Sequence, residues 1–285
     1  MSWRLIDLGE EVRCAVADNP GPMTLDGTRS YLIGSERAIL LDPGPADEDL
    51  RARVETLVDG ARVELVCLTH AHADHAGGAT LAAGWLDAPV AASAGTLRAL
   101  GSDGRILVDG EKLPLDHGGS LLRVLTTPGH SSDHLSYLHV PSGDLYTGDL
   151  VLGSGTAMVG DPDGHMGSYL ASLERLSELH PVRILPGHGE PVTDPVERLG
   201  EYHRHRLERE RQIETAVRDG AASVSGIRER VYEDLPASLE WAAEASIRAH
   251  LKHLEECGER LPHLEGRDVE GLGHGEIEAG VGLGA

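Results

Sequence analysis

The sequence predicts an α+β fold, in which strands and their covering helices form a four-layer αβ/βα sandwich followed by a small helical domain. Three observations support this prediction. Short apolar runs alternate with segments of helical periodicity as far as residue 193. Several of these runs end in His or Asp beside a glycine, and from Asp194 onward the chain becomes highly charged and helical. A length of 285 residues fits one large domain with a smaller appendix.

The first half of the chain alternates between predicted strands and predicted helices. Short apolar runs predict strands at residues 12–17, 30–34, 38–41, 63–69 and 89–92. Apolar positions three and four apart predict helices at residues 48–58, 74–86 and 95–100. The loop that begins after Thr69 therefore connects a buried strand to a helix.

The second half of the large domain is predicted to contain an antiparallel set of strands at residues 112–140. This set is broken at Gly118 and Gly119 and again at the Pro128-Gly129 turn, which ends a strand at 121–127. Further strands are predicted at residues 144–148 and 183–185. A helix at 166–179 should bury one stripe of leucines: Leu170, Leu173 and Leu176.

The C-terminal part of the chain is predicted to be helical. A long charged helix at residues 197–218 has few apolar positions and suits a bridge between units, so we expect domain boundaries at 1–193, 194–220 and 221–265. Two helices at 223–232 and 238–257 and a short strand at 261–264 would follow. The second helix carries an apolar stripe that needs a partner, either the large domain or a second chain: Leu239, Ala243, Ile247, Leu251 and Leu254. The Gly-rich tail at 266–285 is expected to be disordered.

One run of ten residues, from Thr69 to Gly78, carries the strongest chemical signal in the chain. It places three imidazoles and a carboxylate within six positions, namely His70, His72, Asp74 and His75. Imidazole is the commonest ligand for zinc-like ions at neutral pH, and a neighbouring carboxylate favours a hard or borderline cation. His70 and His72 can point to one side of the loop and share an ion. Asp74 and His75 lie past the bend and would serve a second ion.

Further ligand-type residues follow other short apolar runs. His130 comes after Pro128-Gly129, Asp149 follows the strand at 144–148, and His188 comes after Pro186-Gly187. Asp42, followed by Pro43-Gly44, adds a carboxylate at a fourth strand end. Glycine beside each position lets the backbone approach closely.

These five segments, in this order, resemble the metallo-β-lactamase fold superfamily. The resemblance implies a binuclear site in which His70, His72 and His130 hold one ion, Asp74, His75 and His188 hold the other, and Asp149 bridges them. Asp42 would hold a ligand in its orientation from behind. The C-terminal helices and the expected strand resemble the small winged-helix-like domain of the LACTB2-like branch, which is related to glyoxalase II.

The resemblance also implies a hydrolase that uses a metal-bridging hydroxide. The two divalent ions are expected to be zinc, with iron or manganese as alternatives. Asp149 would fix the pair, and Asp74 would orient the nucleophile. His134, four residues past His130, is the candidate for a proton donor or a supporting partner of the ligands.

Several substrates and reactions remain open. We expect a small acyl substrate such as a thioester, and the alternative is an endoribonuclease or phosphodiesterase acting on single-stranded RNA. A mononuclear iron oxygenase would not need the intact set of Asp74, His75 and His188. Hydrolysis of β-lactam antibiotics is disfavoured because Asp149 stands where the commonest zinc β-lactamases carry Cys.

Composition limits the partners. With 47 acidic and 25 basic side chains the net charge is -22, so a broad phosphate-binding surface is not expected and RNA is disfavoured. Residues 221–285 are themselves acidic, which favours packing or homodimer formation over DNA binding. Cys14, Cys67 and Cys257 are scattered and read as free thiols in a reducing compartment. No segment has the apolar length of a membrane span or an export signal, so we expect a cytoplasmic protein with no membrane partner.

Overall fold

The computed structural model describes residues 3–9, 11–116 and 119–259, which separate into two compact units. The first unit contains Met1–Val159 and Asp163–Leu207, and the second contains Gly160–Pro162 and Glu208–Ala285. The predicted strand at 261–264 and the tail at 266–285 lie outside the described residues. Among the residues that the structure describes, no helix is both long and apolar enough to cross a membrane.

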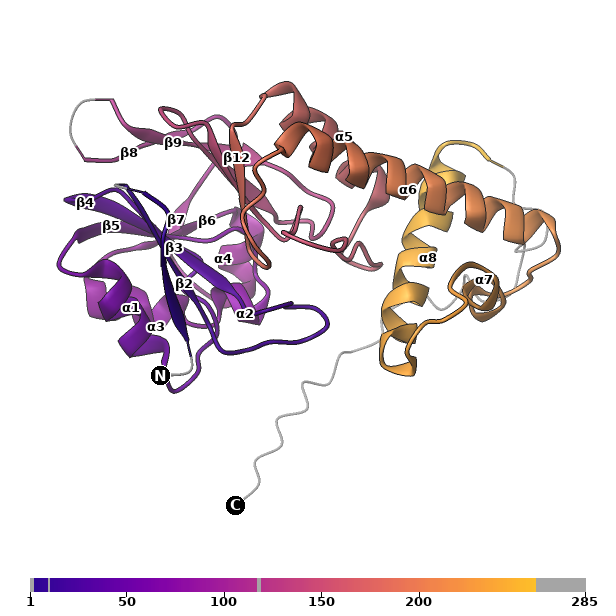
Figure 1. Ribbon diagram of the computed structural model, residues 1–285, viewed down its shortest axis with the longest axis horizontal. Coiled ribbons are helices and arrows are strands. Elements are labelled where there is room, and N and C mark those ends of the chain that lie inside the picture. Colours follow the sequence, from indigo (N-terminus) through magenta and orange to yellow (C-terminus); the bar gives the residue numbers. More distant parts are fainter. Residues whose placement is uncertain (1–2, 10, 117–118, 260–285) are drawn as a thin grey trace, which may run out of the picture. The chain divides into compact units, whose positions relative to one another are not determined.

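The first unit is built on two β-sheets (Figure 1). The larger sheet has its strands in sequence order: β1 (Arg4–Asp7), β2 (Val12–Val16), β3 (Arg29–Ile33), β4 (Arg37–Leu41), β5 (Arg62–Cys67), β6 (Val90–Ala92) and β7 (Arg105–Ile106). The pairs from β1 to β4 are antiparallel, and the pairs from β4 to β7 are parallel. Residues that follow β4 and β5 therefore emerge at the same edge of the sheet.

The smaller sheet has the order β12-β11-β10-β9-β8. Its strands are β8 (Lys112–Pro114), β9 (Leu121–Thr126), β10 (Leu135–His139), β11 (Asp144–Gly148) and β12 (Arg183–Pro186). The pairs from β8 to β11 are antiparallel, as predicted for residues 112–140, and β11 pairs with β12 in parallel. The parallel pair places the residues after Gly148 and Pro186 side by side.

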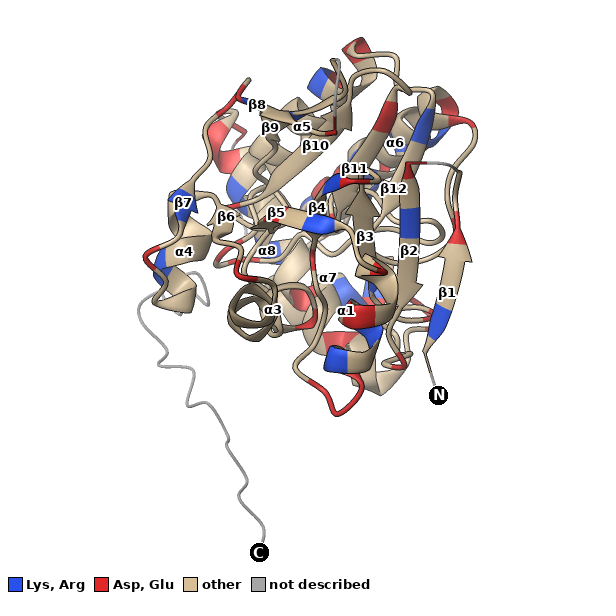
Figure 2. Cartoon of the chain, turned by 90° about the vertical axis from the view of Figure 1, so that its left-hand side faces the viewer, with Lys and Arg blue, Asp and Glu red and all other residues tan. Residues whose placement is uncertain are grey.

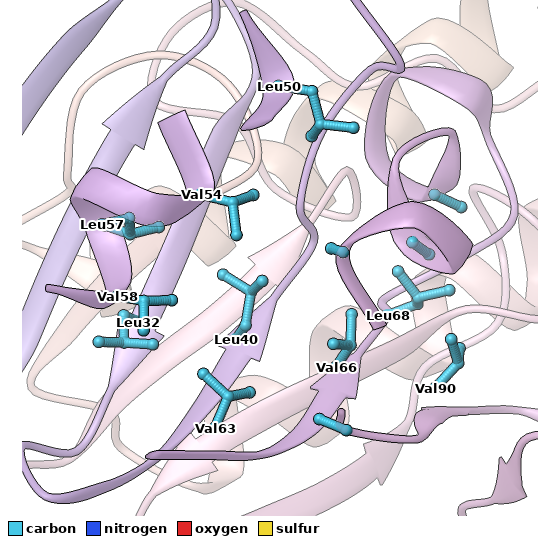
Figure 3. Packing of buried hydrophobic residues seen from close by; sticks show 14 of the residues in the cluster. Leu32, Leu40, Leu50, Val54, Leu57, Val58, Val63, Val66, Leu68 and Val90 are labelled. Carbon is cyan, nitrogen blue, oxygen red and sulfur yellow. The ribbon is translucent and has the colours of Figure 1, made fainter. Parts of the chain in front are cut away.

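Helices cover the outer face of the larger sheet. They are α1 (Leu50–Val58), α3 (Ala79–Leu86) and α4 (Ala94–Leu100). Side chains of β4 alternate between the two faces, as expected for a strand buried on both sides. Leu40 packs beneath the helices with Leu57 and Val66 (Figure 3), whereas Ile39 and Leu41 belong to the core between the sheets.

The core between the two sheets contains three buried tyrosines, Tyr31, Tyr137 and Tyr146, and two of their hydroxyl groups donate to backbone carbonyls at strand ends. The Tyr137 hydroxyl donates to the carbonyl of Leu68 over 2.6 Å, and the Tyr31 hydroxyl donates to the carbonyl of Pro186 over 2.6 Å. Both acceptors lie just before ligand-type residues. These hydrogen bonds fix the backbone at the points where the loops of the site begin.

The fourth layer is α5 (Met166–Glu178), which lies on the smaller sheet and buries Leu170, Leu173 and Leu176 as predicted. Its Tyr169 hydroxyl donates to the carbonyl of Leu150, and its Ser172 hydroxyl donates to that of Pro128. The predicted four-layer αβ/βα sandwich is confirmed.

Two features of the first unit differ from the sequence prediction. The edge strands β1 and β7 were not predicted, because charged side chains and a length of two residues in β7 leave little apolar periodicity. The single helix predicted at 74–86 is instead two helices, α2 (Ala73–Ala76) and α3, with Gly77 and Gly78 between them. At this break the Gly78 N–H donates to the carbonyl of Gly44, and a Cβ on Gly78 would lie 2.7 Å from Leu50. The helix is therefore interrupted at Gly77 and Gly78, where the backbone bonds to the loop after β4 instead of continuing the helix.

The second unit is helical. The long helix α6 (Pro195–Arg218) begins in the first unit and ends in the second, which also contains α7 (Val224–Val231), the 3₁₀ turn η1 (Ala237–Leu239) and α8 (Glu240–Glu256). The predicted stripe of α8 is buried except for Leu239, which is half-buried. The sequence predicted that this stripe packs on the large domain or on a second chain. In the structure Ile247, Leu251 and Leu254 pack on apolar residues of their own unit, which lie on α6, on α7 and in the loop between them: Ile213, Ala216, Val217, Ala221 and Ile227.

Candidate metal centre

Asp42 directly follows β4 and fixes other residues of the site through hydrogen bonds. Its backbone adopts the left-handed region with φ 48°, which Asp tolerates better than most residues, and its side chain is 3% exposed. One carboxylate oxygen accepts the Thr69 N–H over 2.8 Å. The other accepts the Thr69 hydroxyl over 2.7 Å and the Nδ1–H of His75 over 2.9 Å. A single carboxylate therefore fixes the end of β5 and the ring of His75.

These hydrogen bonds set the tautomers of two histidines. Because the Thr69 hydroxyl donates its only proton to Asp42, its oxygen accepts from Nδ1–H of His70, 2.9 Å away. His70 and His75 thus each hold a proton on Nδ1 and direct Nε2 toward the site. Second partners of this kind orient metal-binding imidazoles.

The first group of converging side chains contains His70, His72, His130 and Asp149, whose ligand atoms all lie within 4.8 Å of one another. Nδ1 of His72 lies 2.9 Å from Nε2 of His70 and 3.1 Å from Nε2 of His130. His130 donates its Nδ1–H to the carbonyl of Met158 over 2.7 Å, so its Nε2 is also a lone pair. The Nε2 lone pairs of His70 and His130 therefore both face Nδ1 of His72. A cation bound between the three rings would accept all three nitrogens as ligands.

The second group contains Asp74, His75, Asp149 and His188. Nε2 of His75 and Nε2 of His188 are 3.2 Å apart, while their Nδ1 atoms face Asp42 and the carbonyl of Gly27. Oδ2 of Asp74 lies 3.1 Å from Nε2 of His188 and 3.6 Å from Nε2 of His75. Nitrogen and oxygen donors that converge in this way fit a divalent ion.

Asp149 belongs to both groups. Its Oδ1 lies 3.1 Å from Nε2 of His75 and 3.3 Å from Nε2 of His188, and its Oδ2 lies 3.8 Å from Nε2 of His130. The neighbouring strand must carry glycine at this point, because a Cβ on Gly187 would lie 2.7 Å from the Asp149 Oδ1. The two oxygens of one carboxylate thus face two different donor groups.

The two groups differ in their electrostatics. Burial, reinforced by neighbouring imidazoles, lowers the pKa of His70 well below its usual value and also lowers that of His130. Burial opposes protonation of His75 and His188 too, but Asp149 outweighs it, so the pKa of His188 rises to about 9 and that of His75 lies well above its usual value. At neutral pH the metal-free first group is ready for a cation, whereas the second must release protons.

Metal binding to the second group should therefore depend on pH. His75 and His188 have raised pKa values, that of His188 being about 9, so their protons compete with the metal and affinity should fall as the pH drops. His70 and His130 have lowered pKa values, so protons on these two rings should not compete with the metal above the ordinary imidazole pKa of about 6.5. Calorimetric titration with Zn²⁺ in buffers of different ionisation enthalpy measures the protons released. Equal proton release by both equivalents would contradict this assignment.

His134 lies behind the first group and outside both sets of donors. It is fully buried, its ring stacks on that of His70 at 5.2 Å, and Nδ1 lies 3.0 Å from the Thr127 hydroxyl. Burial lowers its pKa well below the usual value, so an imidazolium that donates a proton at neutral pH is not expected. The alternative, support of the His70 ring, fits its position.

The structure brings all seven predicted ligands together and places Asp42 behind them; their binding of metal stays a prediction. Sequence reasoning missed Thr69 and the carbonyl groups of Gly27 and Met158, which orient the rings of His70, His188 and His130. Thr69 adjoins the histidine run and could have been suspected. The carbonyl groups could not, because any residue supplies one.

Comparison with known proteins identifies the class. Residues 23–188 match the metallo-beta-lactamase superfamily, and residues 223–259 match the beta-lactamase associated winged helix domain. The chain belongs to the metallo-beta-lactamase superfamily and is a hydrolase of that superfamily, with a C-terminal winged helix domain.

Among its relatives are two proteins named beta-lactamase-like protein 2 homolog. The one from Drosophila melanogaster is 35% identical over 84% of this chain and 86% of its own length. The one from Caenorhabditis elegans is 31% identical over 90% and 89%. An atrochrysone carboxyl ACP thioesterase from Aspergillus chevalieri is 33% identical over 74% of this chain and 67% of its own.

Solved structures agree with the fold. A metallo-beta-lactamase family protein from Thermus thermophilus has a TM-score of 0.73 at 24% identity and covers 87% of this chain and 94% of its own. A protein solved in a di-iron-bound form has a TM-score of 0.51 at 30% identity, covering 62% and 94%.

Proposed function

We propose that this protein is a binuclear metal hydrolase of small acyl substrates such as thioesters. The observation that carries the proposal is the position of Asp149, which offers one oxygen to each of two donor groups. A site for one tetrahedral ion would need four ligands. Here seven side chains converge, and the shared carboxylate joins the two sets.

The residues of the site have different roles in the proposed reaction. Two divalent ions held by these residues would lower the pKa of a bound water and would polarise a substrate carbonyl. Asp149 keeps the two groups at a fixed separation, and Asp42 holds the rings of His70 and His75 from behind. The side chain of Asp74 is 28% exposed and His72 is exposed, so the site is open to substrate on their side.

Zinc is our proposal for the metal, with iron or manganese as alternatives. All donors are imidazole nitrogens or carboxylate oxygens, which zinc and iron both accept. The relative in a di-iron-bound form, at 30% identity, makes iron the first alternative. Either metal would leave the division into two groups unchanged.

Charge and similarity both favour an acyl substrate over RNA. Many of the described arginines pair with carboxylates, for example Arg211 with Glu208 and Arg218 with Glu214, both on α6. Figure 2 shows basic and acidic residues interspersed along the chain. With a net charge of -22, phosphate must approach against repulsion. The relative named as a thioesterase supports an acyl substrate.

We expect kcat/KM on a panel of acyl thioesters to exceed that on labelled single-stranded RNA. Because salt screens repulsion, any cleavage of RNA should persist or rise between about 50 and 200 mM salt, opposite to the usual loss of nucleic-acid binding. The assay compares both substrates with one metal-loaded preparation. Efficient RNA cleavage at low ionic strength that is lost with Asp149→Ala would establish the phosphodiesterase alternative.

A further inference from the structure

The second unit contains a cluster of reactive side chains remote in sequence from the metal ligands. The cluster consists of Glu210 on α6 and His253 and Cys257 on α8. Sγ of Cys257 lies 3.6 Å from Nε2 of His253, and Nδ1 of His253 lies 2.7 Å from a carboxylate oxygen of Glu210. The thiol thus contacts the imidazole, and the imidazole contacts the carboxylate. This order resembles the arrangement in which a base, oriented by a third group, activates a nucleophile.

The geometry points to Cys257 as a site of S-thiolation, a thiol that exchanges with low-molecular-weight disulfides and is activated by the His253–Glu210 pair. Glu210 accepts the Nδ1–H of His253, which leaves the Nε2 lone pair directed at Sγ. The carboxylate stays ionised: burial would raise the pKa of Glu210, but its hydrogen bonds from His250 and His253 lower it. Glu210 is therefore a positioning residue, and His253 is the base that contacts the reacting thiol.

The exchange needs only the Cys257 thiol and the disulfide, and no external oxidant or reductant. His253 takes the thiol proton, and the Cys257 thiolate attacks one sulfur of the disulfide. A new S–S bond forms at Cys257 while the S–S bond of the reagent breaks. The departing thiolate then takes the proton from the imidazolium and leaves as a thiol.

Cys257 is the C-terminal cap of α8 and lies one turn after His253 on the same helix. Glu210 comes from α6, and both imidazoles that contact it, those of His250 and His253, lie on α8 together with Cys257.

The other two cysteines are not expected to react with a disulfide reagent in the native protein. Cys14 and Cys67 are fully buried, and burial raises the pKa of the Cys14 thiol to about 12 and that of Cys67 still further. Cys257 is exposed. A disulfide reagent added to the native protein should therefore report on Cys257 alone, and Cys257→Ser should abolish the reaction.

The experiment measures the second-order rate of reaction of the full-length native protein with glutathione disulfide and with an aromatic disulfide, by intact mass and absorbance. At pH 7 we expect wild type to react about tenfold faster than His253→Gln and about fivefold faster than Glu210→Gln, because the thiolate is the nucleophile. Near pH 10 the three rates should converge, since any cysteine is then largely ionised. Lys252→Gln, a neighbouring charge change on α8, should react like wild type.

Three results would overturn the proposal. One is a His253→Gln rate equal to wild type at pH 7. Another is a difference that persists at pH 10, which would mean that His253 controls access and not the proton. The third is an equal loss in Lys252→Gln. Circular dichroism checks the fold of each variant, and Glu210→Gln tests the same pair if His253→Gln does not fold.

Discussion

Replacing Asp149 with alanine is expected to lower kcat/KM by at least about a thousandfold, ~4 kcal/mol of transition-state stabilisation. The change removes the one carboxylate whose oxygens face both donor groups, and a water cannot hold the two groups in register. The fold should survive, because Asp149 contributes no apolar surface to either core of the first unit. Steady-state kinetics with the best thioester and a thermal melt measure the two effects.

His203→Ala is the matched control. His203 is also a histidine of the first unit, but it lies on α6 and contacts Glu174 at 3.2 Å. Loss of this partly exposed contact changes stability by about 0–1 kcal/mol and should leave activity intact. Similar losses of activity in both variants would show that the site has been assigned to the wrong histidines.

Asp42→Asn is expected to weaken metal binding by both donor groups, about 10- to 100-fold each. The substitution keeps the volume of the side chain but places an amide N–H₂ where an oxygen accepts from both Thr69 and His75. The Nδ1–H of His75 would then face another donor. The Thr69 hydroxyl would also lose the acceptor that directs its own oxygen toward the Nδ1–H of His70. Titration against a chromophoric chelator measures each affinity.

Thr69→Val separates the two branches of this network. Valine has nearly the shape of threonine but lacks the hydroxyl that links His70 to Asp42, while His75 keeps its own hydrogen bond. We therefore expect weaker binding by the first group only. If Asp42→Asn also affected only one group, Asp42 would not be the common support.

Strand ends explain why so much of the site could be predicted from the sequence. His70, His130, Asp149 and His188 each follow a short apolar run, and parallel neighbours such as β11 and β12 bring the residues after those runs to one edge. Whether a residue follows a strand depends only on its neighbours in the chain, so it can be predicted from a single sequence.

Long-range contacts explain what could not be predicted. The break between α2 and α3 depends on Gly44, which lies far from Gly78 in the sequence. The partner of the α8 stripe is the end of α6, a helix whose charged sequence hides Ile213 and Val217 among polar neighbours. The different protonation of the two histidine groups depends on Asp149, which reaches them only in the folded chain.

Elemental analysis of the purified protein tests the binuclear centre most directly. We expect two metal ions per chain in fully active wild type. His130→Ala should lose the ion of the first group, and His188→Ala the ion of the second, so each variant should retain one. A stable, fully active wild-type protein with one metal ion per chain would contradict a centre in which Asp149 joins two ions.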